Sequence, residues 1–452
     1  DVTFGGAIAA DVARRIGLSE VLASGRYFID PEACLRPPPT TSRAPSERHR
    51  LHTATKSVAC ISEMYNAAAW RSAAALPLGQ NDLQTLLEAA VTAPSGGNMQ
   101  PWLWIYHHRL LLLTLDRQRA GGILDFEARG SLVALGAAAE NVVLAAHDQG
   151  FVVRLYPFPF DDQPDVVVAF EFFEPGQPET EAHDQDHLYH MVAKRLTNRR
   201  VGTRVALSEA QRVAIVRAAQ SIPGAAVQLL TDPNLMGEVG NILGQGDRLR
   251  LLDPMLHAEF VSEVCWTAEE AARRHDGIAV EEMDLRPLDQ AGLAICRDWD
   301  ALQWVQQVGG GSGLEALSGK AIDAASAVAL ITMPGTRPLD YFNGGRAVQR
   351  IWLTATSHQV ALQPMTALPY LFTRLIEGHG QGLSVDMKKG LDRLRQRYTG
   401  LFEMKDQRGE IMLCRLARVD APERQSRQHQ SDGDNSSNRA VASRRSGVVI
   451  PS

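Results

Sequence analysis

The sequence predicts an α+β fold in which helices pack on a mainly antiparallel sheet, and it predicts this unit twice in one chain. The first observation is that strand-like runs and helical patterns follow a similar order in two parts of the chain. The second is a pair of helical segments, GAAAENVVLAAHDQGF (136–151) and GRAVQRIWLTATSHQV (345–360). Each has small residues and a central polar residue and ends just before a strand, so we interpret the pair as an internal duplication.

The first copy is expected to begin with a helix that Asn81 or Asp82 caps. Its leucines and alanine at 83, 86, 87 and 90 have the spacing of one helix face. A long helix over about 130–149, ended by Gly150, is apolar almost all round and should be central and buried. The expected strands of this copy are 102–108, 110–115, 151–158 and 165–172.

The second copy is expected to contain helices at about 208–220, from about 234, and at 345–359, with strands at 225–231 and 327–333. Residues 252–320 break the similarity between the copies, and glycines cluster at 309–313. Long irregular insertions often have a function, so we interpret this segment as an insertion or lid with a flexible strip.

The remaining segments set the expected domain limits. Residues 31–50 are rich in Pro, Ser and Arg, as linkers are, and the polar segment 420–452 is expected to be a disordered tail. We therefore divide the chain as follows: 1–30, the tail of a preceding domain; 31–50, a linker; 51–185, the first half; 186–419, the second half with its insertion; 420–452, the tail.

Composition restricts the classes of partner. The chain has 452 residues, 22% of them charged, and a formal net charge of -6, so we expect neither nucleic acid nor membrane as a partner. No apolar run reaches the roughly 18 residues of a membrane span, and the first residues do not read as a signal peptide. Five cysteines without a CxxC pair favour reduced thiols and no metal site, and hence a cytoplasmic protein. Because the chain begins at Asp1 rather than Met, we expect a piece of a longer protein.

The stretch APSGGNMQPW, residues 93–102, is the most informative segment of the sequence. Gly96 and its neighbouring glycine let the backbone approach a flat ligand closely. Ser95, Asn98 and Gln100 supply hydroxyl and amide groups, while Pro94 and a second proline stiffen the two ends. A plain helix-to-strand turn is the alternative interpretation.

A second motif, KRLTNRR (194–200), contains Arg195, Thr197 and Arg199 at alternate positions. Guanidinium groups and a hydroxyl suit a phosphate, and a cation also stabilises negative charge that develops on a reduced ring. A solvated basic helix cap is the alternative interpretation of this segment.

Together these motifs resemble the nitroreductase family of FMN-dependent oxidoreductases, whose loop reads Ala-Pro-Ser-x-x-Asn-x-Gln-Pro-Trp. The resemblance covers roughly residues 55–418. It implies an α+β sandwich that dimerises, with FMN at the interface between the loop of one subunit and an Arg-x-Ser-x-Arg/Lys motif of the other. In this chain Thr197 replaces the serine. By resemblance Arg195 lies toward the phosphate and ribityl chain, and Arg199 toward the ring edge.

Each half of the chain retains only one of these motifs. The first half has RLHTATKS where the arginine motif is expected, and the second has AQSIPGAAVQ where the loop is expected. This resembles the tandem single-chain type of the family, two half-copies forming an intrachain pseudo-dimer with a single flavin. A large lid covers the site in some members.

The resemblance also suggests two further contacts with the cofactor. The segment around Pro364 and Met365 would face the flavin, where a backbone N–H can approach N5, and Arg415 would reach the phosphate. A core turn is the alternative for the first, and a solvated residue for the second. Separately, VTFGGAIAADVARRIG with SGRYFID, within residues 1–30, resembles the end of a ubiquitin-activating-type adenylating domain.

The sequence therefore predicts an FMN-dependent NAD(P)H oxidoreductase that passes electrons to a small flat acceptor, such as a nitroaromatic or a quinone. The flavin carries this chemistry, so no side chain is assigned as catalytic. No GxGxxG fingerprint is present, so NAD(P)H would share the flavin pocket as co-substrate. The alternatives are an FMN-sequestering protein with little turnover and a flavin-free interaction module. The chain is expected to be a monomer or a homodimer.

Overall fold

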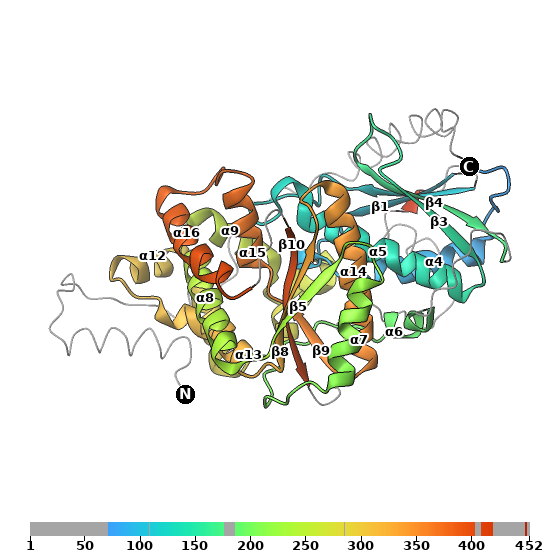
Figure 1. Cartoon of the computed structure of the whole chain (residues 1–452). Helices are drawn as coiled ribbons and strands as arrows, with labels where there is room; N and C mark the ends of the chain where they lie inside the picture. The colour runs from blue at the N-terminus through green and yellow to red at the C-terminus, as the bar shows by residue number, and fades with distance from the viewer. Residues whose placement is uncertain are drawn as a thin grey trace.

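Two sheets with flanking helices confirm the predicted α+β class (Figure 1). The structure is a computed structural model that describes residues 71–107, 109–175, 186–283, 285–402, 408–418 and the backbone of 448–449. The predicted adenylating-type segment, the linker and the first-half counterpart of the arginine motif lie outside the described residues. The expected half and domain limits stay predictions.

In the chain, one helix precedes the strands of the first sheet, and a second, long helix lies between the second and the third of these strands. Its strands lie in the order β1-β2-β4-β3, and each of these neighbouring pairs is antiparallel. The elements are α4 (Gln80–Val91), η1 (Gly96–Asn98), β1 (Trp102–His107), β2 (Leu110–Leu115), η2 (Phe126–Ala128), α5 (Arg129–Asp148), β3 (Val152–Pro157) and β4 (Val166–Phe173).

The second sheet repeats this order. Its strands lie as β5-β8-β10-β9, again antiparallel throughout, and its long helix occupies the same place between the second and third strands. The elements are η3 (Asp186–Leu188), α6 (Tyr189–Val192), α7 (Glu209–Gln220), β5 (Ala226–Leu230), β8 (Ala327–Met333), α14 (Pro338–Ser357), β9 (Val360–Pro364), α15 (Ala367–Ile376), α16 (Val385–Thr399) and β10 (Gly409–Arg418).

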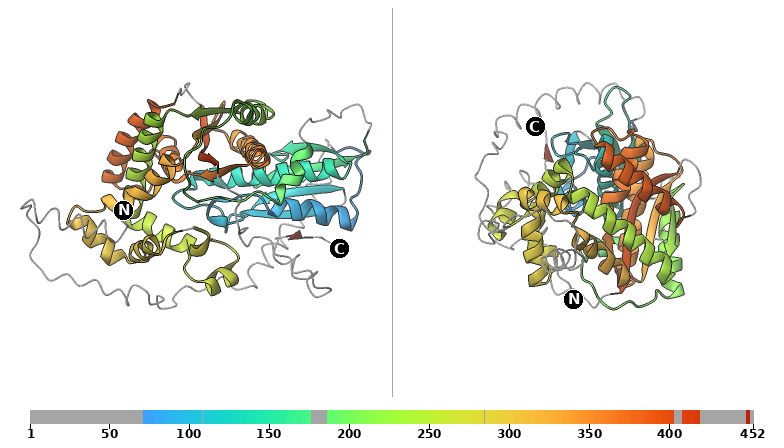
Figure 2. Two further views of the ribbon diagram at one scale, coloured as in Figure 1. Left: turned by 90° about the horizontal axis from the view of Figure 1, so that it is seen from below. Right: turned by 90° about the vertical axis from the view of Figure 1, so that its left-hand side faces the viewer.

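Helices fill the connection between β5 and β8, and in Figure 2 the yellow helices form one side of the molecule. The expected flexible glycine strip is instead ordered, because Gly311 and Gly313 are buried and the carbonyl of Gly310 accepts a hydrogen bond from Arg248. The elements are α8 (Pro233–Leu251), α9 (Pro254–Glu263), β6 (Val264–Cys265), α10 (Ala268–Arg274), β7 (Ile278–Ala279), η4 (Val280–Met283), α11 (Pro287–Cys296), α12 (Trp299–Gln307), η5 (Ser312–Glu315) and α13 (Ala316–Asp323).

Local signals explain where several elements begin. Ser208 caps α7, the helix predicted at about 208–220, with a reciprocal capping box to Gln211. The predicted caps Asn81 and Asp82 are wrong, because α4 begins at Gln80 with Gly79 as its N-cap. The prediction that 420–452 is disordered is wrong for two of its residues. Val448 and Val449 form β11, which pairs in parallel with β1.

The helices α5 and α14 cross at the centre of one shared core, which Figure 1 shows between the two sheets. A Cβ at Gly136 of α5 would lie 1.9 Å from the carbonyl oxygen of Phe342, and one at Gly345 of α14 would lie 2.0 Å from that of Val133. Only glycine permits so close a backbone approach. The contact is reciprocal, because the same offset of 209 positions relates Gly136 to Gly345 and Val133 to Phe342.

A buried polar cluster lies beside this crossing. The Glu140 carboxylate, with 0% of its side chain exposed, accepts hydrogen bonds from Nε of Arg346 and of Arg350, at 2.8 and 2.5 Å. Next to it, Nε2 of Gln349 donates to Oδ1 of Asn141 at 2.7 Å. Burial raises the pKa of Glu140, but attraction to the two arginines outweighs this and holds the pKa below its ordinary value.

One helix, Phe126–Asp148, is long and apolar enough to cross a membrane, yet 89% of its apolar window is buried inside the protein. This window contains most of α5, so its composition follows from its central position between the two sheets. The search covered the described residues alone.

Substituting Gly136 with alanine tests the close helix approach. We expect Gly136→Ala to lower the free energy of unfolding by about 1–3 kcal/mol, because the new methyl group would force the two backbones apart. The matched control is Gly237→Ala in α8, where an added Cβ meets no atom within 4 Å. That change should stabilise the helix by about 0.5–1 kcal/mol. Urea unfolding of both variants measures this difference, and equal effects would contradict the account.

Substituting Glu140 with glutamine tests the buried cluster. Because the pKa of Glu140 is lowered in the folded state, its contribution to stability is present above about pH 4.5 and is lost as the pH falls through the lowered pKa. Glu140→Gln should cost about 3–5 kcal/mol at pH 7 by leaving the buried Arg350 and the half-buried Arg346 without an anion. The difference in the free energy of unfolding between wild type and Glu140→Gln should become smaller in acid. Urea unfolding at pH 7 and pH 3.5 measures this difference, with Glu88→Gln at an exposed position as the control. A difference that is the same at both pH values would refute the account.

Candidate functional site

The loop between α4 and β1 folds into a tight turn. Gly97, Asn98 and Gln100 have positive φ angles of 55°, 53° and 51°. The backbone N–H of Gln100 donates to Oγ of Ser95 at 3.0 Å, which closes the turn and leaves the Ser95 hydroxyl proton free to donate. Left-handed backbone at residues other than glycine costs about 1–3 kcal/mol and concentrates at functional sites. The loop is therefore a tight turn with three residues in the left-handed region.

The loop has a buried anchor on one side and open space on the other. Trp102, at the start of β1, is 3% exposed and belongs to the shared core. A Cβ added at Gly96 would meet no atom within 4 Å, and Pro94, Ser95 and Asn98 are half-buried. Gly96 itself is exposed, so this part of the turn faces solvent.

Arg195, from the second motif, reaches the base of this loop. Its Nη2 donates to the carbonyl oxygen of Thr92 at 2.8 Å, and its guanidinium carbon lies 4.6 Å from the ring centroid of Trp352. The residue is 9% exposed, and its buried Nε has no hydrogen-bond partner. Burial lowers the pKa of Arg195 to about 10, and no carboxylate of the described residues pairs with it. It is a buried cation with an unused donor.

The other two residues of the motif extend along the second sheet. Thr197 forms a parallel bridge with Leu362 of β9. Arg199 makes a long 3.5 Å contact from Nη1 to the carbonyl oxygen of Glu282 in the insertion. Burial lowers the pKa of Arg199, although the nearby Glu282 carboxylate opposes that shift. Residues 195–200 follow the short helix α6, and the alternative of a solvated basic cap does not fit Arg195, which is buried.

Arg415 holds the motif in place from β10. Its guanidinium donates to the carbonyl of Arg200 at 2.7 Å and to Oε1 of Gln363 at 2.6 Å, with further bonds to the carbonyls of Ala321 and Asn198. The residue is 1% exposed, and burial lowers its pKa to about 10. Arg415 therefore fixes the backbone of the motif through the carbonyls of Asn198 and Arg200. Its contact with a phosphate stays a prediction.

The segment around Pro364 is a strand end followed by a helix. Pro364 pairs with Cys414 across the sheet, and the Met365 side chain packs against the cluster on the outer face of that sheet. The backbone N–H of Met365 donates to the carbonyl of Leu413 at 2.7 Å. That N–H is therefore not available for the predicted approach to a flavin N5.

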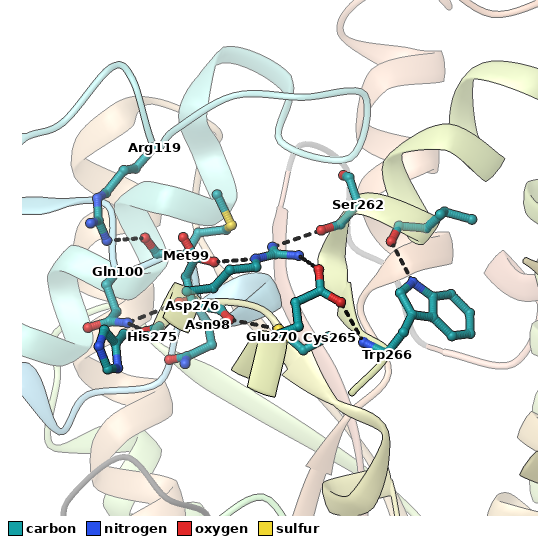
Figure 3. A network of polar contacts seen from close by, with 12 residues as sticks. Asn98, Met99, Gln100, Arg119, Ser262, Cys265, Trp266, Glu270, His275 and Asp276 are labelled. Atoms are coloured by element: carbon teal, nitrogen blue, oxygen red, sulfur yellow. Dashed lines mark hydrogen bonds and ion pairs between the residues drawn. The ribbon is translucent and has the colours of Figure 1, made fainter. Parts of the chain in front are cut away.

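The insertion lies against the loop, as Figure 3 shows. Nε2 of Gln100 donates to the carbonyl of His275 at 2.8 Å, so this side chain is directed to the insertion rather than to the arginine motif. A Cβ at Gly97 would lie 3.4 Å from Cγ of Glu263, and Glu263 in turn pairs with Arg250 at 3.0 Å. Access to the loop thus depends on the position of this part of the insertion.

The structure brings the arginine motif to the base of the loop at one point, the contact of Arg195 with Thr92. Thr197 joins β9 two residues before Pro364, and Arg415 holds the backbone of the motif. Among the described residues, no hydrogen bond or ion pair joins Ser95 to Arg199. Sequence reasoning missed Trp352 and His275, because neither belongs to a local motif and each contacts a residue far away in the chain.

Comparisons with known proteins give partial matches. No family model matches the chain. The chain is 31% identical over 434 residues to a Mycobacterium tuberculosis (strain CDC 1551 / Oshkosh) protein named "Uncharacterized protein MT1398", covering 93% of this chain and 55% of that protein. It is 29% identical over 101 residues to "Putative NAD(P)H nitroreductase acg" of the same strain, covering 22% of this chain and 30% of that protein.

The chain spans about half the length of the first relative and less than a third of the second. Among solved structures, a nitroreductase with bound FMN from Bacteroides fragilis is similar at 10% identity. The match covers 56% of this chain and 98% of that chain, with a TM-score of 0.30, a likeness too low to assign a fold.

Proposed function

We propose that this chain is an FMN-dependent oxidoreductase of the nitroreductase type, in which the two halves of one chain form a pseudo-dimer around a single flavin site. One observation carries the proposal. Arg195, from the second half, is a buried cation with an unpaired Nε, and it is bonded at Thr92 to the base of the loop from the first half.

The donor set fits FMN. A buried guanidinium with an unpaired N–H and no carboxylate partner is suited to hold an anion, which a phosphate or a reduced ring would provide. The Ser95 hydroxyl can still donate, and Gly96 is exposed and has no side chain that would obstruct a flat ring. Arg199 would add a second cation, while Arg415 fixes the segment that carries both. When bound, FMN supplies hydride acceptance from NAD(P)H and electron transfer to a small flat acceptor.

The pseudo-dimer part of the proposal is supported by topology. Both sheets have the same strand order, and each encloses one long helix at the same place in the chain. The two helices approach reciprocally at Gly136 and Gly345 with a constant offset. An interface between two copies of one unit has this property when a two-fold axis relates them. A relative named "Putative NAD(P)H nitroreductase acg", which matches over 101 residues, supports the proposed reaction class.

A second candidate function is FMN sequestration with little turnover. The contacts of the insertion with Gln100 and Gly97 favour it, because they restrict access to the loop. Anaerobic addition of NADPH to the yellow protein separates the two functions. Bleaching near 450 nm within seconds would support the oxidoreductase, and unchanged colour would support sequestration. A protein that takes up no FMN would contradict both.

Removing either arginine of the motif tests the site itself. We expect Arg195→Ala and Arg199→Ala each to weaken FMN binding by at least tenfold, because a charge-assisted hydrogen bond contributes about 1.5–3 kcal/mol. Fluorescence titration of apoprotein with FMN measures the change. The matched control is Arg204→Ala, whose Nε donates only to the carbonyl of Asp323 in the same region. Equal affinity in all three variants would refute the assignment.

A further inference from the structure

Arg195 lies over an aromatic ring that the motif does not contain. Its guanidinium carbon is 4.6 Å from the ring centroid of Trp352, whereas the other cation–π pairs in the described part of the chain lie at 5.1 Å or more. Trp352 belongs to α14 and is 1% exposed. The ring and the cation are therefore both removed from water, which makes their attraction strong.

The guanidinium has few other interactions that hold it. One hydrogen bond joins it to the carbonyl of Thr92, the residue that caps the C-terminus of α4. That end of the helix carries a partial negative charge, which favours the cation. Since no carboxylate fixes Arg195, the Trp352 face and the Thr92 carbonyl together determine where its free donor points.

The first half offers no ring at the equivalent helix position. The reciprocal contact at Gly136 and Gly345 sets an offset of 209 positions between the two long helices. At this offset the counterpart of Trp352 is Val143 of α5, which is 3% exposed and aliphatic. Of the two long helices, which the structure describes in full, only α14 therefore supplies an aromatic face at this position.

We propose that Trp352 is the positioning residue for Arg195, and that it directs the unpaired Nε of Arg195 toward the anionic flavin at the place where the loop and the arginine motif meet. The inference rests on the proposed function. It goes beyond that function by assigning the orientation of Arg195 to one side chain of the central helix, at a position outside both motifs. Trp352 acts through Arg195 and is not expected to contact the flavin itself.

The test is a double-substitution cycle on the dissociation constant for FMN, measured by fluorescence titration of the full-length apoprotein. Trp352→Leu should raise the dissociation constant about 30-fold, because a desolvated cation–π contact contributes about 2 kcal/mol. Trp352→Phe keeps a ring and should raise it no more than about fivefold. In an Arg195→Ala background, Trp352→Leu should change the constant less than about threefold, because the partner is gone.

Two further variants separate positioning from packing. Val143→Ala removes buried volume at the equivalent place and should lower thermal stability without moving the dissociation constant more than about threefold. If Trp352→Leu does not fold, Trp352→Met provides the non-aromatic variant, since methionine adapts to irregular spaces.

The outcomes distinguish the inference from the proposed function. Wild type that binds FMN, with a Trp352→Leu variant of equal affinity, would overturn the role of Trp352 and leave the flavin proposal standing. An equal loss in both the wild-type and Arg195→Ala backgrounds would also overturn it, because Trp352 would then act on packing alone. Wild type that binds no FMN would overturn the proposed function and this inference with it.

Discussion

The close approach of α5 and α14 is the contact on which the rest of the structure depends. Two glycines let the helix backbones meet, and each would place a Cβ about 2 Å from a carbonyl oxygen of the other helix. The contact merges the inner faces of both sheets into one core. It also sets the distance between the loop on one side and the arginine motif on the other, so the candidate site follows from this crossing.

Two charged groups are buried near this crossing, and they differ in the partners that surround them. Glu140 lies between Arg346 and Arg350, so its cluster contains partners of both signs and belongs to the fold. Arg195 has only a carbonyl and an aromatic ring as partners, and its Nε is unpaired. Buried cations without an anion are costly, and they persist where a ligand compensates them. This difference distinguishes a structural cluster from a candidate site.

Local sequence signals predicted the elements well. The strand at 110–115, the helix from about 208 and the apolar helix ending before Gly150 all appear as expected, because each depends on neighbours in the chain. The site was predictable only as two separate motifs. The contact of Gln100 with His275, the Trp352 face and the Arg415 clamp join residues far apart in sequence, and such contacts depend on packing that no local pattern contains.

The most direct test of the account is the number of flavins bound by one chain, measured by native mass spectrometry of the protein saturated with FMN. A pseudo-dimer with one complete site predicts one FMN per polypeptide, whether the chain is a monomer or pairs with a second copy. Two FMN per chain would show that both halves hold a working site. No FMN on a folded chain would show that the loop and the arginine motif do not form a flavin site, and either result would contradict the account.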